Sequence, residues 1–173
     1  FITDAFSQCL SKDVVQEIIK DPSKLVLGGK NYNMTAIFTD IQKFSGFSEL
    51  LTADQLVALL NYYLTRMSEI IIAEHGTVDK YEGDAIVAFV GAPVPMKDHA
   101  ERACSAALKM KKAEMAINRE ILEVAALPQK PEEIPENLYS AFKIMVENKR
   151  TMFTRIGLNS GEIVAGFMGS DNK

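Results

Sequence analysis

The sequence has few of the residues that mark several common classes of protein. Its two cysteines, Cys9 and Cys104, are isolated and lack the spacing of a metal site, so we expect two reduced thiols. The longest uninterrupted apolar run extends only from Ala85 to Val90, far short of the roughly 20 residues that a membrane-spanning helix needs. No basic stretch followed by an apolar one opens the chain, so we expect no signal peptide.

An excess of positive charge is also absent. The 19 lysines and arginines are outnumbered by 23 aspartates and glutamates, and the basic residues are not concentrated in one segment. Because nucleic-acid binding needs a basic surface, we expect no nucleic-acid partner. With 173 residues, of which 47% are hydrophobic and 24% charged, the chain is long enough for one globular domain with a sizeable core.

The first half of the chain alternates between strand and helix patterns. Residues 34–39 have the composition of a buried strand. Thr52, with Gln55 three residues later, forms a capping box, which predicts the start of an amphipathic helix over residues 53–76. Two short apolar segments within residues 77–90 then predict a hairpin, with its tight turn at the central Gly-Asp pair.

The second half repeats this alternation. Asp98 and Glu101 predict another capping box, followed by a helix with an alanine-rich apolar face. Prolines over residues 128–135 indicate a loop, and residues 138–145 predict a short amphipathic helix. Residues 152–168 predict a second hairpin. This order of elements predicts an α+β fold with a ferredoxin-like (split βαβ) sheet and helices on one face.

Two aspartates stand at the ends of predicted strands. Residues 37–45 (IFTDIQKFS) place Asp40 after a strand, and residues 79–89 (DKYEGDAIVAF) place Asp84 in the hairpin turn. Each alone is explained as a cap or a turn residue. On strands that lie side by side, however, the two carboxylates suit Mg²⁺, which proteins hold with one or two carboxylates plus substrate phosphates. The sequence alone leaves that adjacency open.

The same stretches resemble the class III nucleotidyl cyclase catalytic domain, which converts ATP or GTP to a 3′,5′-cyclic monophosphate. The family pattern F-x-D-I-x-x-F-[ST] matches residues 38–45, and K-x-x-G-D matches residues 80–84. Residues 155–166 (RIGLNSGEIVAG) resemble the strand pair R-[IV]-G-[IL]-x-x-G-x-[VIL]-x-x-G. Three matches in the family's order are far more specific than one glycine motif. The resemblance implies the class III cyclase fold, with its C-terminal part missing from this chain.

The resemblance implies a cation site and a phosphate site. Asp40, Asp84 and the backbone carbonyl of Ile41 would hold two divalent cations, Mg²⁺ or Mn²⁺. Two such ions activate the attacking 3′-hydroxyl oxygen and neutralise the leaving oxygen. The backbone amides of Phe44 and Ser45, at the start of a short helical segment, would bind the triphosphate.

The resemblance also gives roles to two basic residues, each of which by itself is an ordinary surface charge. Arg155 would contact the triphosphate, since a guanidinium group fits phosphate geometry. Lys80 stands where adenylate-forming members of the family place a purine-reading lysine. An ammonium group only donates hydrogen bonds, which suits the acceptor N1 of adenine and not the N1–H of guanine. The predicted substrate is therefore ATP, and the predicted activity is that of an adenylate cyclase.

The family's domain continues, beyond the residues matched here, to a second purine-reading residue and to an Asn and an Arg that act on the ribose and the transition state. We interpret residues 1–33 as a lead-in from an upstream sensor or membrane region and residues 34–173 as the N-terminal major part of one catalytic domain on the cytoplasmic side. Family active sites are shared across a head-to-tail dimer, so we expect a homodimer and an inactive chain when it is truncated here.

Alternative functions stay open from the sequence. One is a guanylate cyclase, and another is a regulatory module that dimerises without turnover. A diguanylate cyclase is disfavoured because its Gly-Gly-[Asp/Glu]-[Asp/Glu]-Phe turn is absent from the hairpin, which reads EGD at residues 82–84.

Overall fold

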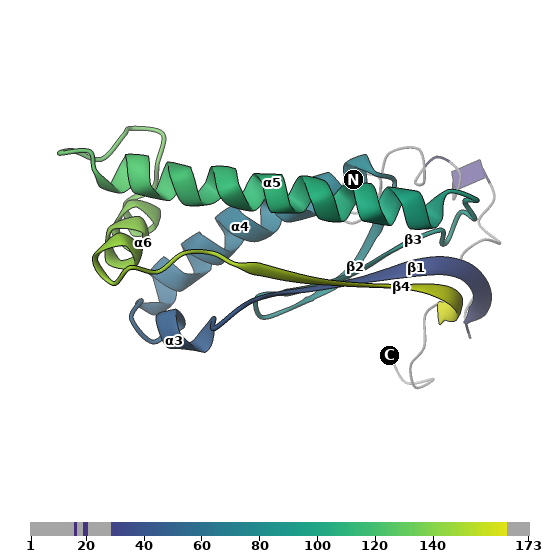
Figure 1. Cartoon of the computed structure of the whole chain (residues 1–173). Coiled ribbons are helices and arrows are strands. Elements are labelled where there is room, and N and C mark those ends of the chain that lie inside the picture. The colour runs from purple at the N-terminus through teal and green to yellow at the C-terminus, as the bar shows by residue number, and fades with distance from the viewer. Residues whose placement is uncertain (1–15, 17–18, 21–28, 166–173) are drawn as a thin grey trace.

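A four-stranded sheet forms the centre of the fold (Figure 1). The computed structural model describes residues 16, 19–20 and 29–165, so most of the lead-in 1–33 lies outside the described residues. The strands are β1 (Lys30–Ile41), β2 (Thr77–Glu82), β3 (Ala85–Val90) and β4 (Thr154–Ala165). Their order in the sheet is β2-β3-β1-β4, and every neighbouring pair is antiparallel.

Helices connect the strands (Figure 1). Between β1 and β2 come α3 (Ser45–Ser48) and α4 (Ala53–Ala73), and between β3 and β4 come α5 (His99–Ala125) and α6 (Glu136–Glu147). The three long ones, α4, α5 and α6, lie on one side of the sheet, whereas the short α3 lies just beyond the end of β1. Because β3 lies between β1 and β2, the unit formed by β1, α4 and β2 is a split βαβ unit. The predicted α+β, ferredoxin-like arrangement is confirmed.

Helix α4 begins at the predicted capping box. The hydroxyl of Thr52 accepts the N–H of Gln55 at 3.3 Å, and the side-chain oxygen of Gln55 accepts the N–H of Thr52 at 2.9 Å. The buried apolar residues of the helix are spaced by one helical turn, at Leu59, Tyr63, Met67 and Ile71. By length and composition α4 could also cross a membrane, but here it packs against α5, α6, β2 and β3 as a core helix.

Helix α5 begins without the capping box that Asp98 and Glu101 predicted. Asp98 has φ −97° and ψ 21°, not extended backbone, and its side chain makes no cap hydrogen bond. Its carboxylate instead accepts the Nε–H of Arg102 at 2.8 Å, one turn further along. The predicted apolar face, which includes Ala103 and Ala107, packs only in part as expected: Ala103 is fully buried but Ala107 is half-buried, and the neighbouring Ala106 is fully buried as well.

The predicted second hairpin is wrong within the described residues, where β4 is one continuous strand. It pairs with β1 from Ile41 opposite Thr154 to Lys30 opposite Ala165. Gly161, part of the predicted turn, lies opposite Met34 in the middle of this ladder. Continuous pairing with a 12-residue strand satisfies backbone groups that a local turn would leave exposed, and it overrides the weak turn signal.

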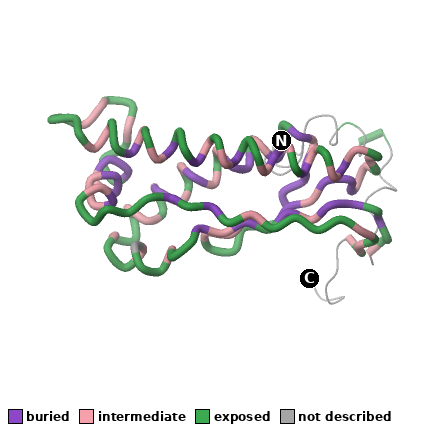
Figure 2. Tube along the Cα trace, in the orientation of Figure 1, coloured by how far each residue is buried: buried purple, intermediate pink, exposed green. Residues whose placement is uncertain are grey.

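The core lies between the helices and the sheet face that they cover (Figure 2). Helix α6 contributes the predicted apolar residues, and Phe142 is fully buried in contact with the ring of Tyr62. On the opposite face of the sheet, Phe38 of β1 is 56% exposed. We call this second face, near the end of β1, the open face.

Candidate active site

Asp40 lies at the end of β1 and is held by Arg155. The two residues stand opposite each other in the ladder between β1 and β4, so their side chains share one face of the sheet. The Nε and Nη2 atoms of Arg155 donate to the two carboxylate oxygens of Asp40 at 2.6 and 2.7 Å. These hydrogen bonds raise the pKa of the guanidinium group. Because the Arg155 and Asp40 side chains are 61% and 39% exposed, a ligand from solvent can reach both.

Asp84 lies in the turn between β2 and β3 and contacts the same end of β1. The turn is possible because Gly83 has φ +63°, a conformation that favours glycine. An oxygen of Asp84 accepts the backbone N–H of Ile41 at 2.7 Å. Since Ile41 follows Asp40 directly, both carboxylates border the same peptide unit. The pairing of β1 with β3 thus provides the adjacency that the sequence left open.

The chain leaves this site through a tight turn into α3. Lys43 has φ 59°, which reverses the chain direction, and the N–H of Phe44 donates to the carbonyl of Ile41 at 3.2 Å. The predicted cation ligand and one predicted phosphate donor are therefore hydrogen-bonded to each other. Ser45 is exposed at the first residue of α3, as the predicted short helical segment requires.

Lys80 lies on the open face, as does Asp40 two residues after Phe38, but Lys80 belongs to β2, two strands away from β1. In the sheet it stands opposite Val87, which stands opposite Phe38, so all three side chains point to the same side. Within the described part of the chain, Lys80 forms an ion pair with Asp79 at 3.2 Å, and its side chain is 54% exposed. The structure therefore brings Asp40, Ile41, Asp84 and Arg155 together in one place and leaves Lys80 outside that group.

A polar cluster next to the site was missed from the sequence. Glu114 of α5 is buried and accepts the N–H of Thr154, the residue before Arg155, at 2.5 Å. The hydroxyl of Tyr63, a fully buried residue of α4, is hydrogen-bonded to that of Thr154 at 2.8 Å, and burial raises the pKa of Tyr63. A glutamate between Met110 and Ile117 on an otherwise apolar helix face was the available signal.

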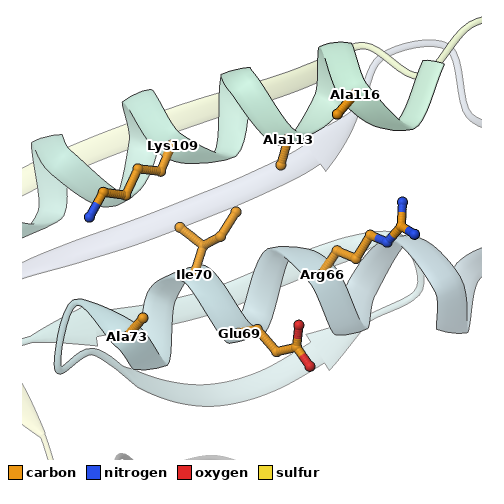
Figure 3. A pocket seen from close by; sticks show the side chains of 7 residues that line it. All are labelled: Arg66, Glu69, Ile70, Ala73, Lys109, Ala113 and Ala116. Carbon is orange, nitrogen blue, oxygen red and sulfur yellow. The ribbon is translucent and has the colours of Figure 1, made fainter. Parts of the chain in front are cut away.

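A separate groove lies between α4 and α5 (Figure 3). It contains none of the predicted site residues. Its lining consists of small or aliphatic residues between charged side chains: Arg66, Glu69, Ile70, Ala73, Lys109, Ala113 and Ala116. The Nη1 atom of Arg66 lies 2.7 Å from a carboxylate oxygen of Glu120, so the positive charge of Arg66 is already paired.

The arrangement at the end of β1 can be compared with known proteins. Residues 29–173 match the family model of the adenylate and guanylate cyclase catalytic domain. The chain belongs to this family. Adenylate cyclase 1 of Rhizobium meliloti (strain 1021) is 32% identical to this cyclase domain over 140 residues, which make up 81% of this chain and 18% of that protein.

Solved cyclase structures have the same fold. The adenylyl cyclase CyaB from P. aeruginosa is 30% identical with a TM-score of 0.64, and the match covers 85% of this chain and 65% of that chain. The guanylyl cyclase Cya2 is 26% identical with a TM-score of 0.65, covering 85% and 63%. The chain thus spans less than two thirds of these relatives, and they include enzymes of both purine specificities.

Proposed function

We propose that this cyclase domain converts ATP to 3′,5′-cyclic AMP and pyrophosphate, using two divalent cations and working as a head-to-tail homodimer. The observation that carries the proposal is the convergence of Asp40 and Asp84 on one peptide unit, through the 2.7 Å hydrogen bond from the Ile41 N–H to Asp84. The proposal concerns the longer protein that contains this domain.

The donor set at this position fits hard divalent cations. Asp40 and Asp84 supply carboxylate oxygens and Ile41 a backbone carbonyl, the ligand types that Mg²⁺ and Mn²⁺ prefer. Among the described residues, no third Asp, Glu, His or Cys joins these two aspartates into a cluster of three. Two carboxylates are nevertheless sufficient when substrate phosphates complete the coordination. When bound, the cations would polarise the reacting oxygens and neutralise the leaving pyrophosphate.

The residues of the chain would supply positioning and charge. Arg155 extends over Asp40 from the neighbouring strand, and its fork of N–H donors is free to contact phosphate oxygens once it leaves that carboxylate. The amides of Phe44 and Ser45 lie at the start of α3, four and five residues after Asp40 in the chain. Reactions of this kind depend mainly on orientation and on stabilisation of developing charge, which fixed donors on a rigid sheet provide.

In this proposal the preference for ATP depends on Lys80, and the dimer forms through the face on which Lys80 lies. Lys80 lies on the open face, beside Val87 and the exposed ring of Phe38, so a second copy packed on this face would meet it directly. In that arrangement the ammonium group can donate to the adenine bound at the partner's carboxylates. The apolar surface of Phe38 would be covered at the same time, which favours association.

A guanylate cyclase is the second candidate, favoured by the likeness to Cya2. The two candidates are separated by assaying the longer protein with ATP and with GTP, in Mg²⁺ and in Mn²⁺, for both cyclic products. We expect cyclic AMP from the wild type and none from Asp40→Ala. The control is Glu82→Ala, which removes an exposed carboxylate from the same hairpin and should keep wild-type turnover. Turnover in Asp40→Ala at saturating Mn²⁺ would refute the cation site.

A further inference from the structure

Thr154, the first residue of β4, has a backbone N–H and a backbone C=O that form no hydrogen bond with β1. The N–H of Gln42 donates to the carbonyl of Phe153 at 2.8 Å, whereas the N–H of Ile41 donates to Asp84. In an antiparallel ladder, pairs with and without hydrogen bonds alternate, so the N–H and C=O of Thr154 point away from β1. β4 is an edge strand of the described sheet, and these two groups need partners from elsewhere.

Helix α5 supplies both partners from side chains one turn apart. Glu114 accepts the N–H of Thr154 at 2.5 Å, and the ammonium group of Lys111 donates to the carbonyl of Thr154 at 3.1 Å. Lys111 also donates to the same oxygen of Glu114 at 2.6 Å, so the buried carboxylate is paired with a charge. The two side chains take the place that a neighbouring strand would occupy.

Asn118, one turn further along α5, holds the chain on the other side of Phe153. Its amide nitrogen donates to the carbonyl of Met152 at 2.7 Å, and its oxygen accepts the N–H of Met152 at 2.8 Å. The ammonium group of Lys111 lies 4.2 Å from the centre of the Phe153 ring. The entry into β4 is therefore fixed at three consecutive residues, immediately before Arg155.

We propose that Glu114 is a positioning residue, which fixes Thr154 and thereby holds the guanidinium group of Arg155 opposite Asp40. An arginine side chain has many rotamers, so its two N–H donors reach both oxygens of Asp40 only if its backbone keeps this register. A slip of one residue would turn Arg155 to the helix-covered face. The consequence for triphosphate binding rests on the proposed function, whereas the positioning itself does not.

The positioning is tested in the 173-residue chain without any ligand, by following the Nε–H resonance of Arg155 by NMR. Its hydrogen bond to Asp40 slows exchange with water. We expect Glu114→Ala to speed this exchange about tenfold, while Glu114→Gln, which keeps an acceptor for Thr154, stays near the wild type. The matched control is Glu120→Ala, a change on the same helix as Glu114, which breaks the ion pair with Arg66 of α4 and should leave the exchange at Arg155 unchanged.

Equal exchange at Arg155 in Glu114→Ala and in Glu120→Ala would overturn the proposal. If Glu114→Ala does not fold, Glu114→Met replaces it, because it removes the acceptor for the N–H of Thr154 while filling the buried position with an apolar side chain. Exchange at Arg155 that stays at the wild-type rate in Glu114→Met would then overturn the proposal equally.

A double-mutant cycle tests the consequence for ligand binding, with Mn²⁺ and inorganic tripolyphosphate as the probe. Glu114→Ala should weaken binding about tenfold in the wild-type background and less than about twofold when Arg155 is already alanine, because residues that act through one another are not additive. Equal losses in both backgrounds would refute the inference and leave the proposed function standing. No binding by the wild type would count against the proposed function alone, since the NMR result still decides the positioning.

Discussion

Removing the two predicted cation ligands should have unequal effects on stability. Asp84 accepts the N–H of Ile41 at 2.7 Å, and Ile41 is only 2% exposed, so Asp84→Ala leaves a nearly buried N–H without its partner. Asp40 contacts Arg155, whose side chain is 61% exposed, and ion pairs this open to water are strongly screened. We therefore expect Asp84→Ala to lower the Tm of the chain and Asp40→Ala to leave it near the wild-type value.

The size of the Asp84 effect follows from the unpaired donor. Leaving a buried backbone donor unsatisfied costs about 1–3 kcal/mol. In a chain of this length, each kcal/mol shifts the Tm by about 2–4 °C. The expected loss for Asp84→Ala is therefore about 2–12 °C, toward the lower end if water reaches the N–H in the variant.

Asp84→Asn separates the structural role of Asp84 from its predicted role as a ligand. The amide oxygen of asparagine can still accept the N–H of Ile41, so the Tm should return to within about 2 °C of the wild type. The neutral side chain should still bind Mn²⁺ poorly, as measured by calorimetric titration. The reasoning fails if Asp84→Ala and Asp40→Ala have the same Tm, or if the Tm of Asp84→Asn is as low as that of Asp84→Ala.

Other consequences can be measured separately. Lys80→Glu in the longer protein should reduce turnover of ATP relative to GTP, and mixing it with Asp40→Ala protomers should restore part of the activity; heterodimers that remain inactive would rule out a shared site. Arg155→Ala should bind Mn²⁺ alone more tightly than the wild type, because a competing cation is removed from Asp40; weaker binding in a titration would contradict this. The hydrogen bond from Arg66 lowers the pKa of Glu120 below its ordinary value of 4.5, so its stabilisation is present above that pH and is lost as the pH falls. The Tm of the wild type should thus fall more steeply in acid than that of Glu120→Gln, and parallel curves would count against the pair.

The sequence was most informative where a local pattern decides the structure. The capping box of Thr52 and Gln55 needs only residues three apart, and both of its hydrogen bonds form. Asp98 shows the limit of such patterns, because Arg102 competes for its carboxylate. The hairpin around Gly83 was equally predictable, because a short turn with a left-handed glycine brings the two flanking apolar segments side by side as antiparallel strands.

Long-range pairing was beyond the reach of such patterns. Residues 154–165 contain Gly157 and Gly161, which weaken a strand when it is considered alone, yet in the sheet both pair with β1 as part of one ladder. The role of Glu114 depends on the same ladder. Its position on the apolar face of α5 is visible in the sequence, but its partner Thr154 lies 40 residues away and becomes its neighbour only through the fold.

The site is already paired within itself, and this limits how a ligand can enter it. Asp40 binds Arg155, the carbonyl of Ile41 binds the N–H of Phe44, and Asp84 binds the N–H of Ile41. Groups predicted to hold a cation are thus joined to groups predicted to hold phosphate. A cation on Asp40 and a triphosphate on Arg155 can together replace both halves of this ion pair, whereas either ligand alone would leave one of the two charged side chains without a partner. We therefore expect the two to bind cooperatively, because each releases the protein group that the other needs.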